Sequence, residues 1–321
     1  MWMRLLMIVA GVALVLWGAD RLTDGAVALA ERMKMPQIVI GLTIVAMGTS
    51  APEFCVSLVS ALKGTPDLAV GNVVGSNIFN TMLIVGVAAM VTPMTILPST
   101  VRRDVPVAVF ASVVLTVMIL IDGNISRLDA ALLFAGLLAF MWLTLRGATK
   151  KGEAPASPDY AETAPDEAAP SLSLPRAIGL LLLGLACLVV GSNIFVDGAS
   201  NVAQSLGVSE AVIGLTIVAG GTSLPELATS VVAARKGNSG IAIGNVLGSN
   251  VMNILLILGG AGLISPMYVK GITIVDFTVM TGSMLLLWLF SYTKLTVARW
   301  EGAVLTAIFL GYMGWLVAGA V

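Results

Sequence analysis

Long apolar segments alternate with short polar ones along the chain, and this pattern predicts the fold class. A helix needs about 20 mostly apolar residues to cross the hydrocarbon core of a bilayer. Ten segments meet that rule. They lie near residues 5–29, 37–62, 67–91, 104–121, 128–146, 174–203, 210–234, 240–264, 272–291 and 299–320. The sequence therefore predicts an all-α integral membrane protein with ten transmembrane helices.

The pattern of apolar and polar positions occurs twice. Adding 173 to each number places residues 37–86 on residues 210–259, with 29 identities in 50 ungapped positions. The match continues upstream, where Asp24 meets Asp197. Because each half holds five spans, an odd number, a linker that stays on one side makes the second half enter the membrane in the opposite orientation. This predicts two inverted-topology five-helix repeats.

Three segments follow from the duplication. Residues 1–146 form the first repeat, residues 174–321 form the second, and residues 147–173 connect them. The connecting segment is rich in proline and acidic residues, which is typical of a polar, disordered tether. Its acids lack the spacing of an EF-hand loop, so the sequence does not favour a calcium-sensing role for it.

The placement of lysine and arginine in the loops predicts the orientation, because cytoplasmic loops carry an excess of both. With the tether assigned to the cytoplasm, twelve basic residues lie inside, four lie outside, and Arg21 falls within the first helix. The inside set is Arg32, Lys34, Arg102, Arg103, Arg146, Lys150, Lys151, Arg176, Arg235, Lys236, Lys294 and Arg299; the outside set is Arg4, Lys63, Arg127 and Lys270. We therefore expect a multi-pass protein of the cell (inner) membrane with both termini outside.

Composition narrows the chemistry. Hydrophobic residues make up 58 % of the chain and charged residues 11 %, which excludes a soluble domain. Histidine is absent, which removes imidazole as a metal ligand or general base. Cys55 and Cys187 are isolated, so neither a thiolate metal site nor a disulfide framework is expected. No nucleotide-binding glycine loop ending in Lys-Ser or Lys-Thr occurs, so ATP drive is unsupported. We expect no enzyme activity and no cofactor.

Each repeat carries one glutamate inside an apolar run, Glu53 and Glu226. An ionised side chain at membrane depth costs about 2.5 to 3.5 kcal/mol on insertion scales. No lysine or arginine lies close by in either motif before Lys63 and Arg235, which sit at loop edges. Two unpaired acids at matched positions indicate a functional site.

The residues before each glutamate predict a broken helix. Pro52 and Pro225 remove the donor that a carbonyl four residues earlier needs, for example that of Gly221. We expect local breaks at residues 46–50 and 219–223. In lipid, freed carbonyls are tolerated only inside protein or at a wet cavity, and a bound cation would satisfy them.

Polar side chains converge on the same place. Thr49 and Ser50 precede Glu53 by four and three residues, which puts them on its side of a helix. In the next span a polar stripe recurs every four residues at Asn72, Ser76 and Asn80. The second repeat has the same pattern at Thr222, Ser223, Asn245, Ser249 and Asn253. This all-oxygen set suits calcium or sodium, and does not suit zinc or copper.

The charge of the set suggests how it would work. An empty site would hold two bare carboxylates, which resist enclosure, whereas one calcium or two or more sodium ions restore neutrality. Ions that compete for one site give exchange. Translocation would then be alternating access around a fixed midplane site.

The motif Gly-Thr-Ser-Ala-Pro-Glu at residues 48–53 and Gly-Thr-Ser-Leu-Pro-Glu at residues 221–226 are each followed by Gly-Asn-Val-x-Gly-Ser-Asn-x-x-Asn. With these paired motifs the chain resembles the cation/calcium exchanger superfamily, and more narrowly the short prokaryotic sodium/calcium exchangers. The resemblance covers nearly the whole chain. It implies a secondary antiporter that exchanges calcium for sodium, with these ions and the lipid bilayer as its partners and no obligatory protein partner or nucleic acid.

The resemblance also implies ligands. Calcium would be held by Glu53 and Glu226 with oxygens of Thr49 and Thr222. Sodium would use Ser50, Ser223, Ser76, Ser249, Asn80, Asn253 and the main-chain carbonyls of Ala46 and Ala219. Many relatives have an acid at one of the positions matching Asn80 and Asn253, whereas this chain has two amides. The tether is also too short for the large calcium-regulatory domains of long exchangers.

Three alternatives stay open on sequence. A proton/calcium exchanger would use the same glutamates as titrating groups, and a potassium-dependent exchanger would add a third ion. A calcium-permeable channel would need its acids in a ring formed by several chains, which the inverted repeat within one chain disfavours. Asp24 and Asp197 fit either a helix end at the interface or an ion pathway.

Overall fold

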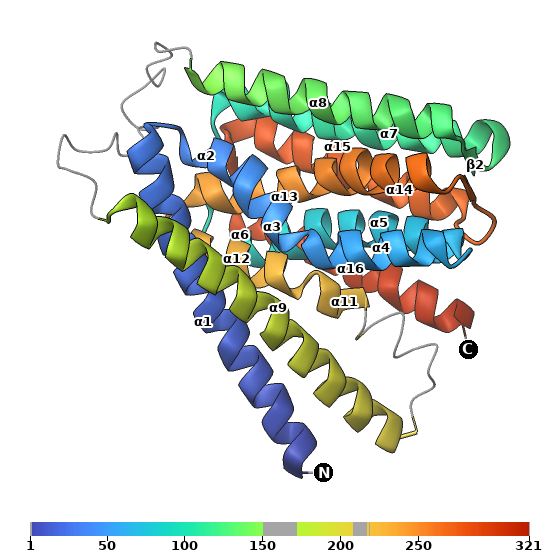
Figure 1. Ribbon diagram of the computed structural model, residues 1–321, viewed down its shortest axis with the longest axis horizontal. Coiled ribbons are helices and arrows are strands. Elements are labelled where there is room, and N and C mark those ends of the chain that lie inside the picture. Colours follow the sequence, from blue (N-terminus) through green and yellow to red (C-terminus); the bar gives the residue numbers. More distant parts are fainter. Residues whose placement is uncertain (1, 150–171, 208–216, 218, 321) are drawn as a thin grey trace.

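The computed structural model describes residues 2–149, 172–207, 217 and 219–320 (Figure 1). Nearly all of them are helical. The elements of the first repeat are α1 (Trp2–Met33), α2 (Gln37–Ile40), the π-helix η1 (Gly41–Val45), α3 (Ala46–Thr49), α4 (Ala51–Leu62), α5 (Pro66–Ile78), the π-helix η2 (Phe79–Ile84), α6 (Val85–Val91), β1 (Met94–Thr95), the π-helix η3 (Thr100–Asp104), α7 (Val105–Asp122), β2 (Asn124–Ile125) and α8 (Arg127–Thr149).

The described elements of the second repeat follow the same order, without a counterpart of η3 before α15. They are α9 (Leu174–Ser205), α11 (Ala219–Thr222), α12 (Leu224–Arg235), α13 (Ser239–Met252), the π-helix η6 (Asn253–Leu258), α14 (Gly259–Ile264), β3 (Met267–Tyr268), α15 (Ile274–Lys294), β4 (Thr296–Val297) and α16 (Arg299–Ala320). Helix α8 runs three residues into the predicted tether, and residues 150–171 of that tether lie outside the described residues.

Within the described part of the chain, eight continuous helical segments are long and apolar enough to cross a membrane. The bent pair Gln37–Thr49 and Ala51–Leu62 makes a ninth. These nine coincide with predicted spans. The predicted span at 210–234 begins among residues that the structure does not describe, and its described part is α11 and α12.

Helices α1 and α9 show the inverted relation between the repeats directly. They are equivalent in sequence, and they pack along each other in opposite directions: Gly11 faces Gly191, and Gly25 faces Ala177. The approach requires glycine, because a Cβ on Gly184 would lie 2.5 Å from the backbone nitrogen of Leu22. Each helix has 32 residues, or about 48 Å, so the pair crosses the other spans obliquely (Figure 1).

The two short sheets also join one repeat to the other. β1 pairs antiparallel with β4, with Met94 opposite Val297, and β2 pairs antiparallel with β3, with Asn124 opposite Tyr268. Each pair places a loop of the first repeat and a loop of the second at the same end of the molecule. This agrees with the sides assigned to these loops by the ten-span topology.

The centre of the molecule is formed by the spans that carry the repeated Gly-Asn-Val motif. Of the described spans, Ser239–Ile264 and Pro66–Val91 are the most deeply buried, whereas α1, α8, α9 and α16 expose most of their apolar surface. The exposed helices therefore suit contact with lipid. The polar stripe predicted from the sequence is buried in protein apart from Asn72, which is partly buried.

Candidate cation site

Glu53 and Glu226 occupy matching places at the start of two half-helices. Each lies in the first turn, of α4 and α12 respectively, with its proline at the adjoining helix start. Proline suits this position because its missing N–H has no partner there in any case. Both glutamates are 1 % exposed. The free N–H groups of a helix start favour a negative charge, so the local fold holds a carboxylate at the centre of the molecule.

The helix break is present but narrower than predicted. The span formed by Gln37–Thr49 and Ala51–Leu62 bends by 49° at Ser50 alone, because Ala46–Thr49 is helical. The matching span of the second repeat breaks at Ser223. The Ala46 carbonyl accepts its helical bond from the Ser50 N–H at 3.0 Å and a longer one from the Thr49 hydroxyl at 3.4 Å, so it is not left without a donor by the break. The freed carbonyl of Gly221 accepts a hydrogen bond from the Ser192 hydroxyl of α9.

Each glutamate is hydrogen-bonded by the serine of the other repeat. Ser50 Oγ donates to Glu226 Oε1 at 3.0 Å, and Ser223 Oγ donates to Glu53 Oε1 at 3.0 Å. The hydroxyls of Ser223 and Ser76 lie 3.2 Å apart. These reciprocal bonds place both carboxylates and three predicted serines in one cluster around the pseudo-twofold axis.

The polar stripe fixes the backbone of the glutamates. Asn72 Nδ2 donates to the main-chain carbonyl of Glu53 at 3.3 Å, and Asn245 Nδ2 donates to that of Glu226 at 3.3 Å. Thr49, which is fully buried, donates its hydroxyl to Asn245 Oδ1 at 3.0 Å. Thr222 is half-buried. The amide nitrogens of Asn72 and Asn245 thus hold the main chain of the two glutamates in place, and the amide oxygen of Asn245 is occupied by Thr49.

Two further asparagines, which the sequence reasoning missed, orient the amides of Asn80 and Asn253. Asn80 Nδ2 donates to Asn250 Oδ1 at 3.1 Å, and Asn253 Nδ2 donates to Asn77 Oδ1 at 3.0 Å. Asn250 Nδ2 in turn donates to the Thr81 hydroxyl at 2.8 Å. Because the amide nitrogens are used across the repeats, the carbonyl oxygens of Asn80 and Asn253 are left over. The signal was present in the sequence, as both copies keep an asparagine three residues before the amide.

Buried oxygens without a hydrogen-bond donor gather at this cluster. Among the described residues they include Glu53 Oε2, Glu226 Oε2, Asn80 Oδ1, Asn253 Oδ1 and Ser249 Oγ. A buried acceptor left unpaired costs about 1 to 3 kcal/mol, and more when it is charged. No ion pair of the described residues involves either glutamate. A dehydrated cation bound in the cluster would supply a partner for carboxylate, amide and hydroxyl oxygens of this kind.

The donor set fits a hard cation with neutral ligands around two charges. The described residues hold no group of three or more acidic, histidine or cysteine side chains. Calcium accepts carboxylate, amide and hydroxyl oxygens together, and sodium of similar size does the same. Ala219 starts α11, as its counterpart Ala46 starts α3. All twelve predicted ligands are among the described residues, with Ser50 and Ser223 at the two breaks and the others in the helices around them.

Irregular helix accompanies the amides. Asn80 lies in η2 and Asn253 begins η6, both π-helical. Such segments leave a main-chain carbonyl without its usual partner and are frequent at functional sites. The sequence predicts regular α-helix at both places. The wider turn of a π-helix does not change the spacing of apolar residues in a recognisable way, so the sequence pattern does not reveal it.

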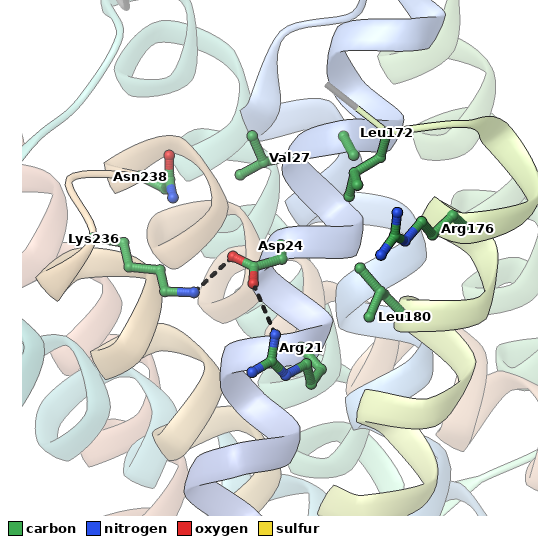
Figure 2. A pocket seen from close by; sticks show the side chains of 9 residues that line it. Arg21, Asp24, Val27, Leu172, Arg176, Leu180, Lys236 and Asn238 are labelled. Atoms are coloured by element: carbon green, nitrogen blue, oxygen red, sulfur yellow. Dashed lines mark hydrogen bonds and ion pairs between the residues drawn. The ribbon is translucent and has the colours of Figure 1, made fainter. Parts of the chain in front are cut away.

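Asp24 and Asp197 lie away from the cluster. Asp24 is bound to Lys236 and Arg21 at one end of the molecule (Figure 2), and Asp197 is exposed on α9. Neither contributes an oxygen to the site described above.

The family model described as "Sodium/calcium exchanger protein" matches residues 3–146 and 176–318, one match in each repeat. The sodium/calcium exchanger MaX1 of Methanosarcina acetivorans is 32 % identical over 340 aligned positions, covering 96 % of this chain and 97 % of the relative. The inner membrane protein YrbG of Escherichia coli is 39 % identical over 265 positions, covering 81 % and 79 %.

A solved structure of the sodium-calcium exchanger NCX_Mj superposes with a TM-score of 0.83 at 28 % identity, covering 97 % of this chain and 98 % of that one. The match over the full length confirms the predicted all-α membrane fold with two inverted five-helix repeats. Both repeats match the family model, and relatives match over almost their whole length. The chain belongs to the sodium/calcium exchanger family.

Proposed function

We propose that this protein is a secondary antiporter that exchanges calcium for sodium across the cell membrane. The observation that carries the proposal is the cluster of five buried oxygens without donors around two glutamates that no basic side chain of the described residues neutralises. Family membership supports the choice of ions, since the relatives MaX1 and NCX_Mj are named as sodium/calcium exchangers.

Calcium would bind between Glu53 and Glu226, with Thr49 and Thr222 completing its ligands. Sodium ions would use the hydroxyls of Ser50, Ser223, Ser76 and Ser249, the amide oxygens of Asn80 and Asn253, and the carbonyls of Ala46 and Ala219. Asn77 and Asn250 would act as positioning residues, because they bind the amide nitrogens and so turn both amide oxygens toward the ions.

The charge of the two glutamates explains why calcium would be exchanged for sodium. Two carboxylates at the centre of a membrane are neutralised by one calcium or by two sodium ions, and only a neutral site can be enclosed at low cost. A protein that closes only when loaded moves one kind of ion in exchange for the other. Access would alternate between the two sides as one helix group moves against the other.

Orientation is part of the proposal. The positive-inside rule places both termini outside and residues 147–173 in the cytoplasm. The protein needs no cofactor in this scheme, because the sodium gradient supplies the energy.

The test is radiolabelled calcium uptake into proteoliposomes loaded with sodium, under separately imposed sodium, potassium and pH gradients. We expect uptake that follows the outward sodium gradient and stops when sodium is replaced by choline. Uptake that persists without sodium and follows a pH gradient would identify a proton/calcium exchanger, and a strict potassium requirement would identify a potassium-dependent one. Single-channel currents in a planar bilayer would instead support a calcium channel.

A further inference from the structure

One end of α1 is held to the turn between α12 and α13 by an ion-pair cluster. Lys236 Nζ lies 2.5 Å from Asp20 Oδ1. It also lies 2.7 Å from Asp24 Oδ1 (Figure 2). Arg21 adds weaker pairs to the same two acids, at 3.6 and 3.8 Å. Partial burial alone would lower the pKa of Lys236, but hydrogen bonds and charge from Asp20 and Asp24 raise it above its ordinary value. Lys236 is therefore charged at neutral pH.

A cavity lies beside this cluster. Its volume is about 600 Å³, and it opens between α1, the start of α9 and the α12–α13 turn, with Arg21, Asp24, Arg176, Lys236 and Asn238 in its wall (Figure 2). The ion pair therefore joins α1 to the α12–α13 unit across a gap that is not filled by side chains. Such a gap leaves room for α1 to shift relative to α12.

The inverted repeat supplies a second set of the same residues at the other end. Lys63 is the counterpart of Lys236, and Asp197 is the counterpart of Asp24, each separated by 173. No ion pair joins Lys63 to Asp197, although the structure describes both. Figure 1 shows the C-terminal end of α9 well away from the end of α4, whereas α1 packs along α12.

We propose that Lys236–Asp24 and Lys63–Asp197 are two alternating latches, each of which closes one end of the protein while the other is open. The inference rests on the exchange activity proposed above. Helices α1 and α9 move together because their glycine faces interlock, so a shift that brings Asp197 to Lys63 withdraws Asp24 from Lys236. In the present structure the Lys236–Asp24 pair is formed, and the described residues Lys63 and Asp197 make no ion pair with each other.

The two latches differ in strength. The counterpart of Asp20 is Asn193, and the counterpart of Arg21 is Ile194, so the second latch has a single carboxylate and no arginine. The Lys236 end is therefore the more tightly held of the two. In the absence of ions, the protein populates the state seen here more than its opposite.

Disulfide trapping tests the proposal. The background carries Cys55→Ala and Cys187→Ala, and the latter keeps the Cβ that packs on Gly18. Into it we place either D24C with K236C or K63C with D197C, and the matched control D24C with K63C, whose residues belong to opposite ends. We expect both latch pairs to cross-link under mild oxidation, the control to remain reduced, and calcium uptake to stop on cross-linking and return with reductant.

Three results decide the outcome. In a variant with all four cysteines, each molecule should carry one cross-link or the other; molecules with both, or a K63C–D197C pair that never forms, would overturn the proposal. In the K63C–D197C background, Lys236→Met should raise the cross-linking rate about two- to fivefold, and Lys236→Arg should leave it near the parent rate. An unchanged rate in K236M would also count against the latch.

The uptake assay on the cysteine-free parent separates this idea from the proposed function. A cysteine-free parent that does not exchange calcium for sodium, together with two cross-links that form and exclude each other in the four-cysteine variant, would refute the ion assignment and leave the latches standing. A parent that exchanges normally, together with cross-links that do not exclude each other in the four-cysteine variant, would refute the latches alone.

Discussion

The two repeats make matching contacts at the centre of the protein and different contacts at its two ends. At the centre, the two copies make matching bonds, with both cross-repeat serine–glutamate bonds at 3.0 Å. At the ends, the copies diverge: Lys236 is bound by two acids, whereas Lys63 lies apart from Asp197. The difference indicates that the ion site can stay nearly symmetric while access to it is asymmetric.

A symmetric centre follows from what the site has to do. An ion that is released on either side must meet the same ligands from both directions, and an inverted repeat gives this without further adjustment. The ends have the opposite requirement, because both being open at once would let ions leak. Variants in the two copies should therefore have equal effects at the centre and opposite effects at the ends.

Neutralising a glutamate should have the largest effect. Glu53→Gln or Glu226→Gln removes half of the charge that binds calcium, and losing one partner of a buried charge pair costs on the order of 3 kcal/mol, about a hundredfold in affinity. We expect calcium uptake into sodium-loaded proteoliposomes to fall to background in both variants. A symmetric centre requires equal losses.

Gel filtration and thermal unfolding serve as the control, since glutamine keeps the size of the side chain and both variants should remain folded. Near-normal transport by either variant would refute the site. A severe loss in one copy and a mild loss in the other would show that the centre is less symmetric than its hydrogen bonds.

This site could be located from the sequence because its chemistry conflicts with its surroundings. A glutamate after a proline in an apolar run is costly, and its exact repetition at a distance of 173 residues excludes chance. The spans could also be predicted, because a helix that crosses the lipid bilayer needs a long apolar segment. The inverted topology followed from an odd number of spans in each half.

The rest depended on tertiary contacts that no local pattern encodes. Asn77 lies one position away from the polar stripe that recurs every four residues. In the fold it nevertheless accepts a hydrogen bond from Asn253 of the other repeat. The π-helical turns at Asn80 and Asn253 widen the helix and leave the sequence spacing unremarkable. The partner of Asp24 was also hidden, because Lys236 is 212 residues away.

Removing one serine hydroxyl should have an intermediate effect. Ser50→Ala removes the 3.0 Å hydrogen bond that Glu226 receives from the other repeat, and Ser223→Ala removes the matching 3.0 Å hydrogen bond to Glu53. A hydrogen bond to a charged group contributes about 1.5 to 3 kcal/mol, so the apparent affinities for both ions should change by about tenfold or more. The ion dependence of uptake measures this. Unequal shifts in the two variants would contradict the symmetric centre.

Losing a positioning amide should have a smaller effect, and here the copies should differ. The side chain of Asn250 accepts from Asn80 and donates to Thr81 and, over 3.9 Å, to the sulfur of Met284. The side chain of Asn77 has two partners, since it accepts from Asn253 and donates to the main-chain carbonyl of Asn250. Leucine has nearly the same size, so Asn250→Leu and Asn77→Leu test the amide itself.

At about 1 kcal/mol for each neutral hydrogen bond, we expect the sodium dependence of calcium release to shift by about five- to tenfold in N250L and less in N77L. Calcium binding through the glutamates should change little in both. The reverse order, or a loss of calcium binding as large as that of a glutamate variant, would argue that these amides hold the fold and do not orient the ion ligands.

Replacing the tether should have the smallest effect. Residues 153–170 contain five acids that belong to neither repeat, and a glycine-serine segment of equal length would keep the halves connected while removing that charge. Because the bonds at the site and at both ends lie within or between the repeats, we expect basal exchange to stay within about twofold, the scale of a weak surface ion pair. Loss of uptake in a folded variant would mean that the acids act on the Lys236 end, whose cavity wall includes Leu172 from the last residues of the tether. The asymmetry between the two ends would then owe part of its strength to a segment outside the duplication.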